Sequence, residues 1–180
     1  MNITALIIDT TSIQNYIFSS NRLKVNIGAS YIVKNIFNTD LNEILESLGK
    51  GFSDWKKSQG QLRFQADENA TWEIGYIGGG NALIFFKNYN LAKEFIKYFS
   101  KKMLLKYPGL NLAFGINKEF DFDNFTDSIK QLHADLQKNK NKYFSRTTLP
   151  KFGFTLECIE SNESAEDFKD EKDYISSVVK

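Results

Sequence analysis

The spacing of apolar residues divides the first half of the chain into a strand, a helix and a hairpin. Residues 3–8 are apolar on both faces, as in a central strand covered on both sides, and this run ends at Asp9. Residues 72–76 alternate between apolar and polar, and residues 82–86 form a fuller apolar run. The four residues between them, Gly78-Gly79-Gly80-Asn81, predict a tight hairpin turn, because glycine takes positive φ without steric cost.

Helical spacing of apolar residues predicts the long helices. The first covers residues 27–48, with a break expected near Asn38, and Gly49 is a natural stop. The second covers residues 90–107 and ends at Pro108-Gly109, and its apolar stripe consists of Leu91, Phe95, Phe99 and Met103. A third begins near Asn124.

Two more alternating runs predict strands, and two polar stretches do not. Residues 110–117 alternate as in a half-buried strand, and residues 152–160 predict a last strand. Residues 50–71 are polar and poorly periodic, so we expect a loop insertion there. Residues 157–180 form an acidic tail that is expected to end in one short helix.

The order of these elements predicts an α+β fold. Strand, helix, strand, strand, helix, strand is the ferredoxin-like βαββαβ pattern of a palm, to which this chain adds a helix and a strand at the C-terminal end. We expect one palm-like domain over residues 1–180. This topology places the end of the first strand, at Asp9, beside the hairpin turn.

Composition excludes some classes of protein. The net charge of +1 gives no overall attraction to nucleic acid. A single cysteine, Cys158, and a single histidine, His133, exclude a disulfide framework and a Cys/His zinc cluster within one chain. We expect Cys158 to be a buried apolar residue and His133 a solvated or boundary residue. No run is long enough to cross a bilayer, so a cytoplasmic protein is expected.

Several motifs in order resemble one family. They are "IIDTTSIQNYIF", the "GAS" of residues 28–30 and "YIGGGNALIFF". Together they resemble the nucleotidyl-cyclase-like palm of the large polymerase-like subunit of type III CRISPR effector complexes and of related stand-alone minimal CRISPR polymerases. The resemblance implies that active members cyclise or polymerise ATP with a GGDD turn. It also implies a palm–palm homodimer or a partner effector subunit.

The turn departs from the family pattern. Gly80 and Asn81 stand where the two aspartates would be, which leaves Asp9 as the obvious acidic ligand for Mg²⁺ or Mn²⁺. One carboxylate is a poor basis for a two-metal site. We therefore favour a catalytically degenerate palm that binds a nucleotide or a partner chain, as a structural or sensing module in prokaryotic antiviral defence.

A purine nucleotide site is expected where the remaining family residues meet. If Gly28-Ala29-Ser30 opens a helix, it offers backbone N–H groups and a hydroxyl to phosphate, although a serine at a helix start is more often a capping or first-turn residue than a ligand contact. Arg22 and Lys24 lie just upstream. The candidate nucleotide-binding residues are Asp9, Arg22, Lys24, Gly28, Ala29, Ser30, Gly78, Gly79, Gly80 and Asn81.

Two alternatives stay open. The first is a divergent nucleotidyltransferase that makes cyclic nucleotides from ATP or GTP, with metal ligands from Asp9, Asn81 and either Asp67 or Glu68. The second is an RNA-binding module. Its basic residues with interleaved aromatics are Lys138, Lys140, Lys142, Tyr143, Phe144, Arg146 and Lys151. The lysines of the second helix, Lys93, Lys97, Lys101, Lys102 and Lys106, are explained by a solvated helix face.

Overall fold

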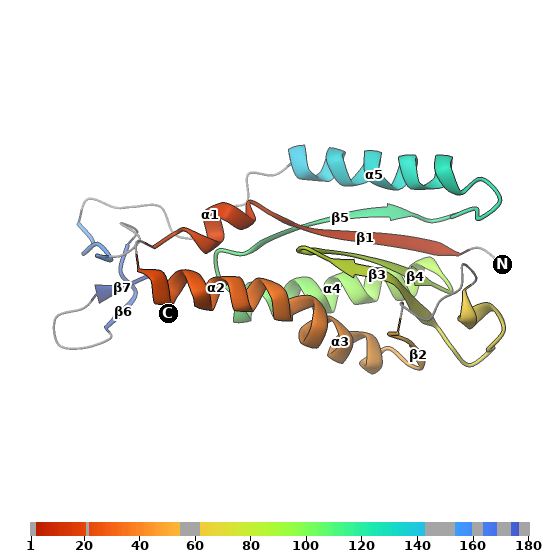
Figure 1. Cartoon of the computed structure of the whole chain (residues 1–180), viewed down its shortest axis with the longest axis horizontal. Helices are drawn as coiled ribbons and strands as arrows, with labels where there is room; N and C mark the ends of the chain where they lie inside the picture. Colours follow the sequence, from red (N-terminus) through yellow and green to blue (C-terminus); the bar gives the residue numbers. More distant parts are fainter. Residues whose placement is uncertain are drawn as a thin grey trace.

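A five-stranded sheet is the centre of the part of the chain that the structure describes (Figure 1). The structure is a computed structural model, and it describes residues 3–20, 22–54, 62–142, 154–159, 164–168 and 174–176. The strands are β1 (Thr4–Thr11), β2 (Gly51–Phe52), β3 (Trp72–Gly78), β4 (Asn81–Phe86) and β5 (Asn111–Asn117). Their order is β2-β3-β4-β1-β5, and all neighbours are antiparallel except β2 and β3.

Helices cover both faces of the sheet (Figure 1). The short helix α1 (Ile13–Ile17) follows β1. One face carries α2 (Leu23–Asn35), α3 (Leu41–Ser47) and α4 (Tyr89–Lys106), which pack against Leu6 and Ile8 of β1. The opposite face carries α5 (Phe125–Lys142), which packs against Ala5 and Ile7. The predicted βαββαβ palm and its added helix are confirmed. Within the described residues, no helix has the length and apolar character needed to span a membrane.

The predicted break in the first long helix is a π-helical turn, Ile36–Asp40, between α2 and α3. Asp40 is 1% exposed and accepts hydrogen bonds from Lys106 Nζ and Tyr107 Oη, both at 2.7 Å, while Lys102 Nζ lies 3.0 Å away. Burial alone would raise the pKa of Asp40, but these hydrogen bonds together hold it below its ordinary value. Lys102 and Lys106 belong to α4. The prediction that the lysines of α4 form only a solvated face is therefore wrong for these two residues.

Side chains of α5 cover part of the open edge of β5. The Asp135 carboxylate accepts a hydrogen bond from the Ile116 backbone N–H at 2.9 Å, and Asn139 Nδ2 donates to the Phe114 carbonyl at 2.8 Å. A Cβ on Gly115 would lie 2.6 Å from a backbone oxygen of α5, so glycine permits this close approach. The helix is thereby held at a fixed position over the sheet.

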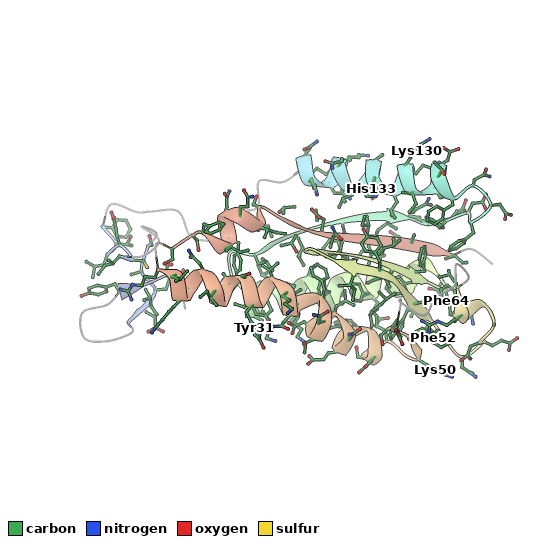
Figure 2. All side chains as sticks on the ribbon, in the orientation of Figure 1. Tyr31, Lys50, Phe52, Phe64, Lys130 and His133 are labelled. Atoms are coloured by element: carbon green, nitrogen blue, oxygen red, sulfur yellow. The ribbon has the colours of Figure 1, made fainter. Side chains whose placement is uncertain are left out.

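An ion pair joins the region expected to be a loop insertion to a buried carboxylate of β3. This region, residues 50–71, includes β2. Arg63 Nε lies 3.0 Å from Oε1 of Glu73, which is fully buried on β3. The Phe64 N–H donates to the other oxygen of Glu73 at 3.2 Å. Lys50, Phe52 and Phe64 lie at one end of the sheet in Figure 2. This segment is thus fastened to the start of β3.

The predicted last strand is wrong in its described part. Residues 154–159 contain an isolated bridge between Glu157 and Ser164 instead of a strand, and residues 152, 153 and 160 lie outside the described residues. Alternation predicts a strand only where a sheet covers one face, and here Phe154 is 89% exposed. Burial of Cys158 is confirmed.

The acidic tail also differs from its prediction. β6 (Asp167–Phe168) pairs antiparallel with β7 (Tyr174–Ile175) in a separate two-stranded sheet. The described part of the tail contains no helix, so the short helix expected there is not found in it. Ile175 is buried, and cross-strand pairing together with this burial favours a strand over the short helix that was expected.

Candidate functional site

The glycine turn lies beside the end of β1, as the topology predicts. Asp9 is the register partner of Asn81, and the Thr10 N–H donates to the Gly80 carbonyl at 2.9 Å. Gly79 and Gly80 have φ angles of 40° and 95°, in the region that favours glycine. Because directly opposed residues of an antiparallel pair share one face, the side chains of Asp9 and Asn81 lie on the same side of the sheet.

Asp9 belongs to the face that α5 covers. Its Oδ2 atom lies 2.5 Å from Lys140 Nζ, and the two side chains are 22% and 27% exposed. Tyr76 is close by, and burial, followed by the charge of Asp9, raises the pKa of its hydroxyl. Lys140 is therefore engaged in an ion pair on the sheet, which corrects its predicted place in a free basic patch.

The rest of that basic patch is only partly described. Lys138 and Lys142 are exposed on the last turns of α5, and His133 is exposed on the same helix, as predicted (Figure 2). The remaining members lie outside the described residues: Tyr143, Phe144, Arg146 and Lys151. Of the predicted patch, the structure thus describes three lysines and neither of the interleaved aromatics.

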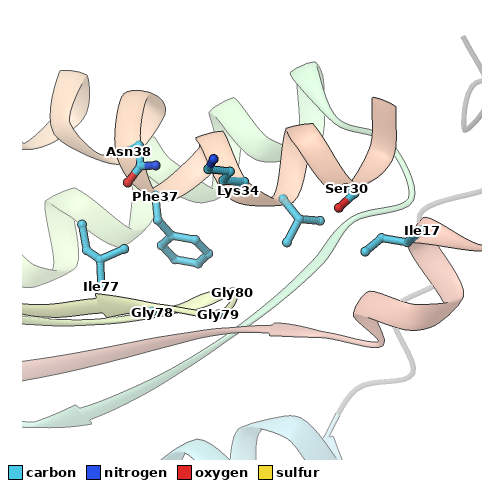
Figure 3. A pocket seen from close by; sticks show the side chains of 10 residues that line it. Ile17, Ser30, Lys34, Phe37, Asn38, Ile77, Gly78, Gly79 and Gly80 are labelled. Carbon is cyan, nitrogen blue, oxygen red and sulfur yellow. The ribbon is translucent and has the colours of Figure 1, made fainter. Parts of the chain in front are cut away.

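A pocket of about 300 Å³ lies between α2 and the glycine turn, on the opposite face of the sheet (Figure 3). Phe37 points from the helix toward the hairpin. The lining residues are Ile17, Ser30, Val33, Lys34, Phe37, Asn38, Ile77, Gly78, Gly79 and Gly80. The pocket combines apolar walls with one hydroxyl, one ammonium and one amide, above a turn whose backbone carries no side chains.

Of the candidate nucleotide-binding residues on the helix, Ser30 lines this pocket. Lys34 and Asn38 follow it at intervals of four residues, so the three polar side chains lie along one side of the helix. Lys34, Phe37 and Asn38 also line the pocket and were not predicted from the sequence. The spacing of Ser30, Lys34 and Asn38 beside the apolar stripe was the available signal.

The expected helix start at Gly28-Ala29-Ser30 is wrong. α2 begins at Leu23, so the N–H groups of residues 28–30 belong to the second and third turns and take part in intrahelical hydrogen bonds. They are not free for phosphate. Gly28 is exposed, Ala29 is buried, and neither lines the pocket.

Arg22 and Lys24 lie before the pocket and do not line it. Arg22 is the N-cap residue of α2, it makes no side-chain cap hydrogen bond, and its own backbone N–H donates to Ser20 Oγ at 3.0 Å. Lys24 is exposed and lies about 9 Å before Ser30 along the helix axis, at 1.5 Å per residue. Contact of either side chain with a nucleotide stays a prediction.

Asp67 and Glu68 do not lie at the turn. Lys50 Nζ lies 2.7 Å from Asp67, and this hydrogen bond is the main cause of the lowered pKa of that carboxyl. The Glu68 carbonyl accepts a hydrogen bond from Lys87, which follows the end of β4. The length of β3 separates this end of the hairpin from the turn by about 20 Å, at about 3.3 Å per residue. These carboxylates cannot join Asp9 around a metal ion.

The turn does not fit the metal ions that its fold implies. Mg²⁺ and Mn²⁺ prefer anionic oxygen ligands, and here Asp9 is held by Lys140 while Gly80 and Asn81 bring no charge. Within the described residues, no group of three or more His, Cys, Asp or Glu side chains could hold a metal ion.

Comparison with solved structures defines the class of fold, a ferredoxin-like palm. A chain of the Csm1-Csm4 cassette in complex with AMPPNP aligns with 78% of this chain, with a TM-score of 0.55 and 18% identity. The cassettes in complex with pppApApA and with cA4 align with 79% and 78% of it, both with TM-scores of 0.54 and 19% identity. In each case the match covers 19% of the neighbour's chain.

These likenesses confirm the palm fold that the sequence predicted, which this chain shares with a chain of the Csm1-Csm4 cassettes. At these identities they concern the fold alone. No family model and no curated protein matches the chain.

Proposed function

We propose that this chain is a catalytically degenerate CRISPR-type palm that binds a nucleotide in the pocket between α2 and the glycine turn. We further propose that it serves as a structural or sensing module in prokaryotic antiviral defence. The observation that carries the proposal is the pocket that Ser30, Lys34 and Asn38 line together with a turn without side chains. The neighbours with nucleotides in their complexes support it.

The pocket residues divide by chemistry into two groups. Lys34 and Ser30 suit a phosphate, because an ammonium and a hydroxyl donate hydrogen bonds to its oxygens. Ile17 and Ile77, which are partly exposed, suit the face of a base, and the Asn38 amide can both donate to and accept from a base edge. A Cβ on Gly79 would meet nothing within 4 Å, so a ligand has open access to the backbone there.

Catalysis is not part of the proposal, because the residues at the turn do not suit metal-assisted nucleotidyl transfer. Such a reaction needs metal ions held between anionic ligands, which steady the triphosphate and the attacking hydroxyl. Asp9 lies on the face opposite the pocket and is neutralised by Lys140. We therefore expect binding in the pocket to need neither Mg²⁺ nor Mn²⁺.

A thermal-shift screen tests the proposal. ATP, GTP, cyclic dinucleotides and short RNAs are each tested with and without Mg²⁺ and Mn²⁺. A ligand at 100 times its Kd adds about 2.7 kcal/mol of stability. We expect a purine nucleotide to stabilise the chain, and Lys34→Met to weaken binding about tenfold, which is about 1.4 kcal/mol. Lys93→Met is the matched control, because Lys93 is exposed on α4 and does not line the pocket.

The other results of the screen are equally informative. A flat screen contradicts nucleotide binding and leaves a purely structural role. Equal affinity of the Lys34 variant and the wild type places the site elsewhere. Stabilisation by RNA alone, falling steeply with salt, would favour the RNA-binding alternative.

A protein partner is also part of the proposal. The matched chains belong to a two-protein cassette, which supports assembly with a partner effector subunit. A palm–palm homodimer is the other assembly that we propose, on the sequence resemblance. Sedimentation velocity of the chain alone distinguishes a palm that forms a homodimer from one that stays monomeric in the absence of its partner subunit.

A further inference from the structure

The periodicity of α5 aims Lys140 at the sheet. Leu132 and Leu136 are buried against the sheet, and Lys140 follows at the same spacing of four residues. Residues at this spacing lie on one face of a helix, so Lys140 continues the buried stripe. Asn139, hydrogen-bonded to the Phe114 carbonyl, fixes the same helix turn over β5. The position of the ammonium therefore follows from how the helix packs.

The carboxylate that Lys140 reaches lies in the interior of the sheet. Asp9 stands on the strand between β4 and β5, opposite Asn81 on one side and Ala113 on the other. Both partners of the ion pair are largely removed from solvent. The C-terminal end of a helix also favours a cation, and Lys140 lies in the last turn of α5. Helix packing, charge and burial thus agree on one cation at this place.

We infer that the Lys140 ammonium is the permanent counter-ion of Asp9 and closes this end of the sheet to divalent metal ions. Mg²⁺ or Mn²⁺ does not fit here for two reasons. The chain supplies its own cation, Lys140, and it lacks the two aspartates of the GGDD turn. A second carboxylate at position 81 would share the face of Asp9, but it would still meet the ammonium. Restored metal binding therefore requires two changes: Asn81→Asp and the removal of the Lys140 charge.

Binding of Mn²⁺ alone, followed by the electron paramagnetic resonance signal of the free ion, tests this inference on four full-length proteins. They are the wild type, Asn81→Asp, Lys140→Gln and the double variant. We expect weak binding by the first three, and at least tenfold tighter binding by the double variant. Lys138→Gln combined with Asn81→Asp is the matched control, because Lys138 is exposed on the same helix, and we expect no gain from it.

Three results would overturn the inference. The first is Asn81→Asp binding Mn²⁺ as tightly as the double variant, and the second is a folded double variant binding no better than the wild type. The third is tight binding by the wild type that Asp9→Asn abolishes.

Circular dichroism checks folding. Lys140→Met, which keeps an unbranched apolar stem, replaces Lys140→Gln if that variant does not fold. If neither variant folds, comparison of Asn81→Asp with the wild type still tests the inference, because tighter Mn²⁺ binding by Asn81→Asp contradicts it. No nucleotide is used, so failure here and failure of nucleotide binding are distinguishable.

Discussion

At the residue scale, Gly80 is constrained twice. Its φ of 95° is one that residues with a side chain rarely adopt, and a Cβ built there would lie 2.4 Å from Cδ1 of Ile13. Gly79 shares only the first constraint, because nothing lies within 4 Å of its Cβ position. A side chain at position 80 would also extend toward α1, away from Asp9. Restoring a carboxylate there thus strains the turn and does not supply a ligand beside Asp9.

We predict that Gly80→Asp destabilises the chain by about 1–3 kcal/mol, through backbone strain and contact with Ile13. Gly79→Asp should cost less, because only the strain applies. Urea denaturation of both variants measures the difference. Adding Ile13→Ala to each variant isolates the contact. This substitution should cost less stability in the Gly80→Asp variant than in the Gly79→Asp variant, because it also removes the contact with position 80. Equal losses for the two aspartate variants would contradict the contact with Ile13.

At the element scale, the π-helical turn is held by charge. Its carboxylate, Asp40, joins the turn to the end of α4 through Lys106 and Tyr107. We predict that Asp40→Asn lowers the free energy of unfolding by roughly 1.5–3 kcal/mol at neutral pH, because hydrogen bonds to a charged group are lost. Asp127→Asn is the control: its carboxylate is 70% exposed, and its pair with Lys130 should contribute about 1 kcal/mol or less.

The same variant has a predicted pH signature. The folded pKa of Asp40 is below its ordinary value of 3.8, so its contribution is present above that pH and is lost as pH falls through the folded pKa. The stability difference between wild type and Asp40→Asn should therefore be greatest near neutral pH and shrink below about pH 4. Urea denaturation at several pH values measures it. A difference that stays constant with pH would show that the Asp40 charge is not responsible.

Some elements follow from the sequence and others do not, for physical reasons. The stripe from Leu91 to Met103 identified α4, because that helix has one buried face. The alternation of residues 110–117 identified β5, although its apolar positions are only partly buried and the buried positions are Ala113, Gly115 and Asn117. The start of α2 was missed because Leu23 and Ile27 are exposed apolar residues, and no side chain caps the helix. The last predicted strand was wrong because the alternation of apolar and polar residues does not show whether a sheet is present to pair with the segment.

The candidate site was predictable in outline. Topology alone placed Asp9 beside the turn, because the first strand of this fold must pair with the hairpin. The ion pair with Lys140 depends on where α5 ends over the sheet, and the register between a helix and a sheet is a tertiary property. Lys34 and Asn38 carry a weak periodic signal, which acquires meaning only when the helix is known to face the turn.

At the scale of the whole molecule, the prediction concerns chemistry. Wild-type chain incubated with ATP or GTP and either Mg²⁺ or Mn²⁺ should form no cyclic or linear oligonucleotide above background, because the negative field that would hold the metal ions is missing. Chromatography of the reaction products measures this. Clear product formation by the wild type, abolished by Asp9→Ala, would support the active nucleotidyltransferase instead.

The covered edge of β5 also limits how copies of this molecule can associate. An open strand edge is a template on which another chain can add a strand. At Phe114 and Ile116 that addition would first have to displace the side chains of Asn139 and Asp135 from the backbone. Lateral growth of the sheet across this segment, the route toward fibrous aggregates, is therefore opposed by two side chains of the chain's own helix.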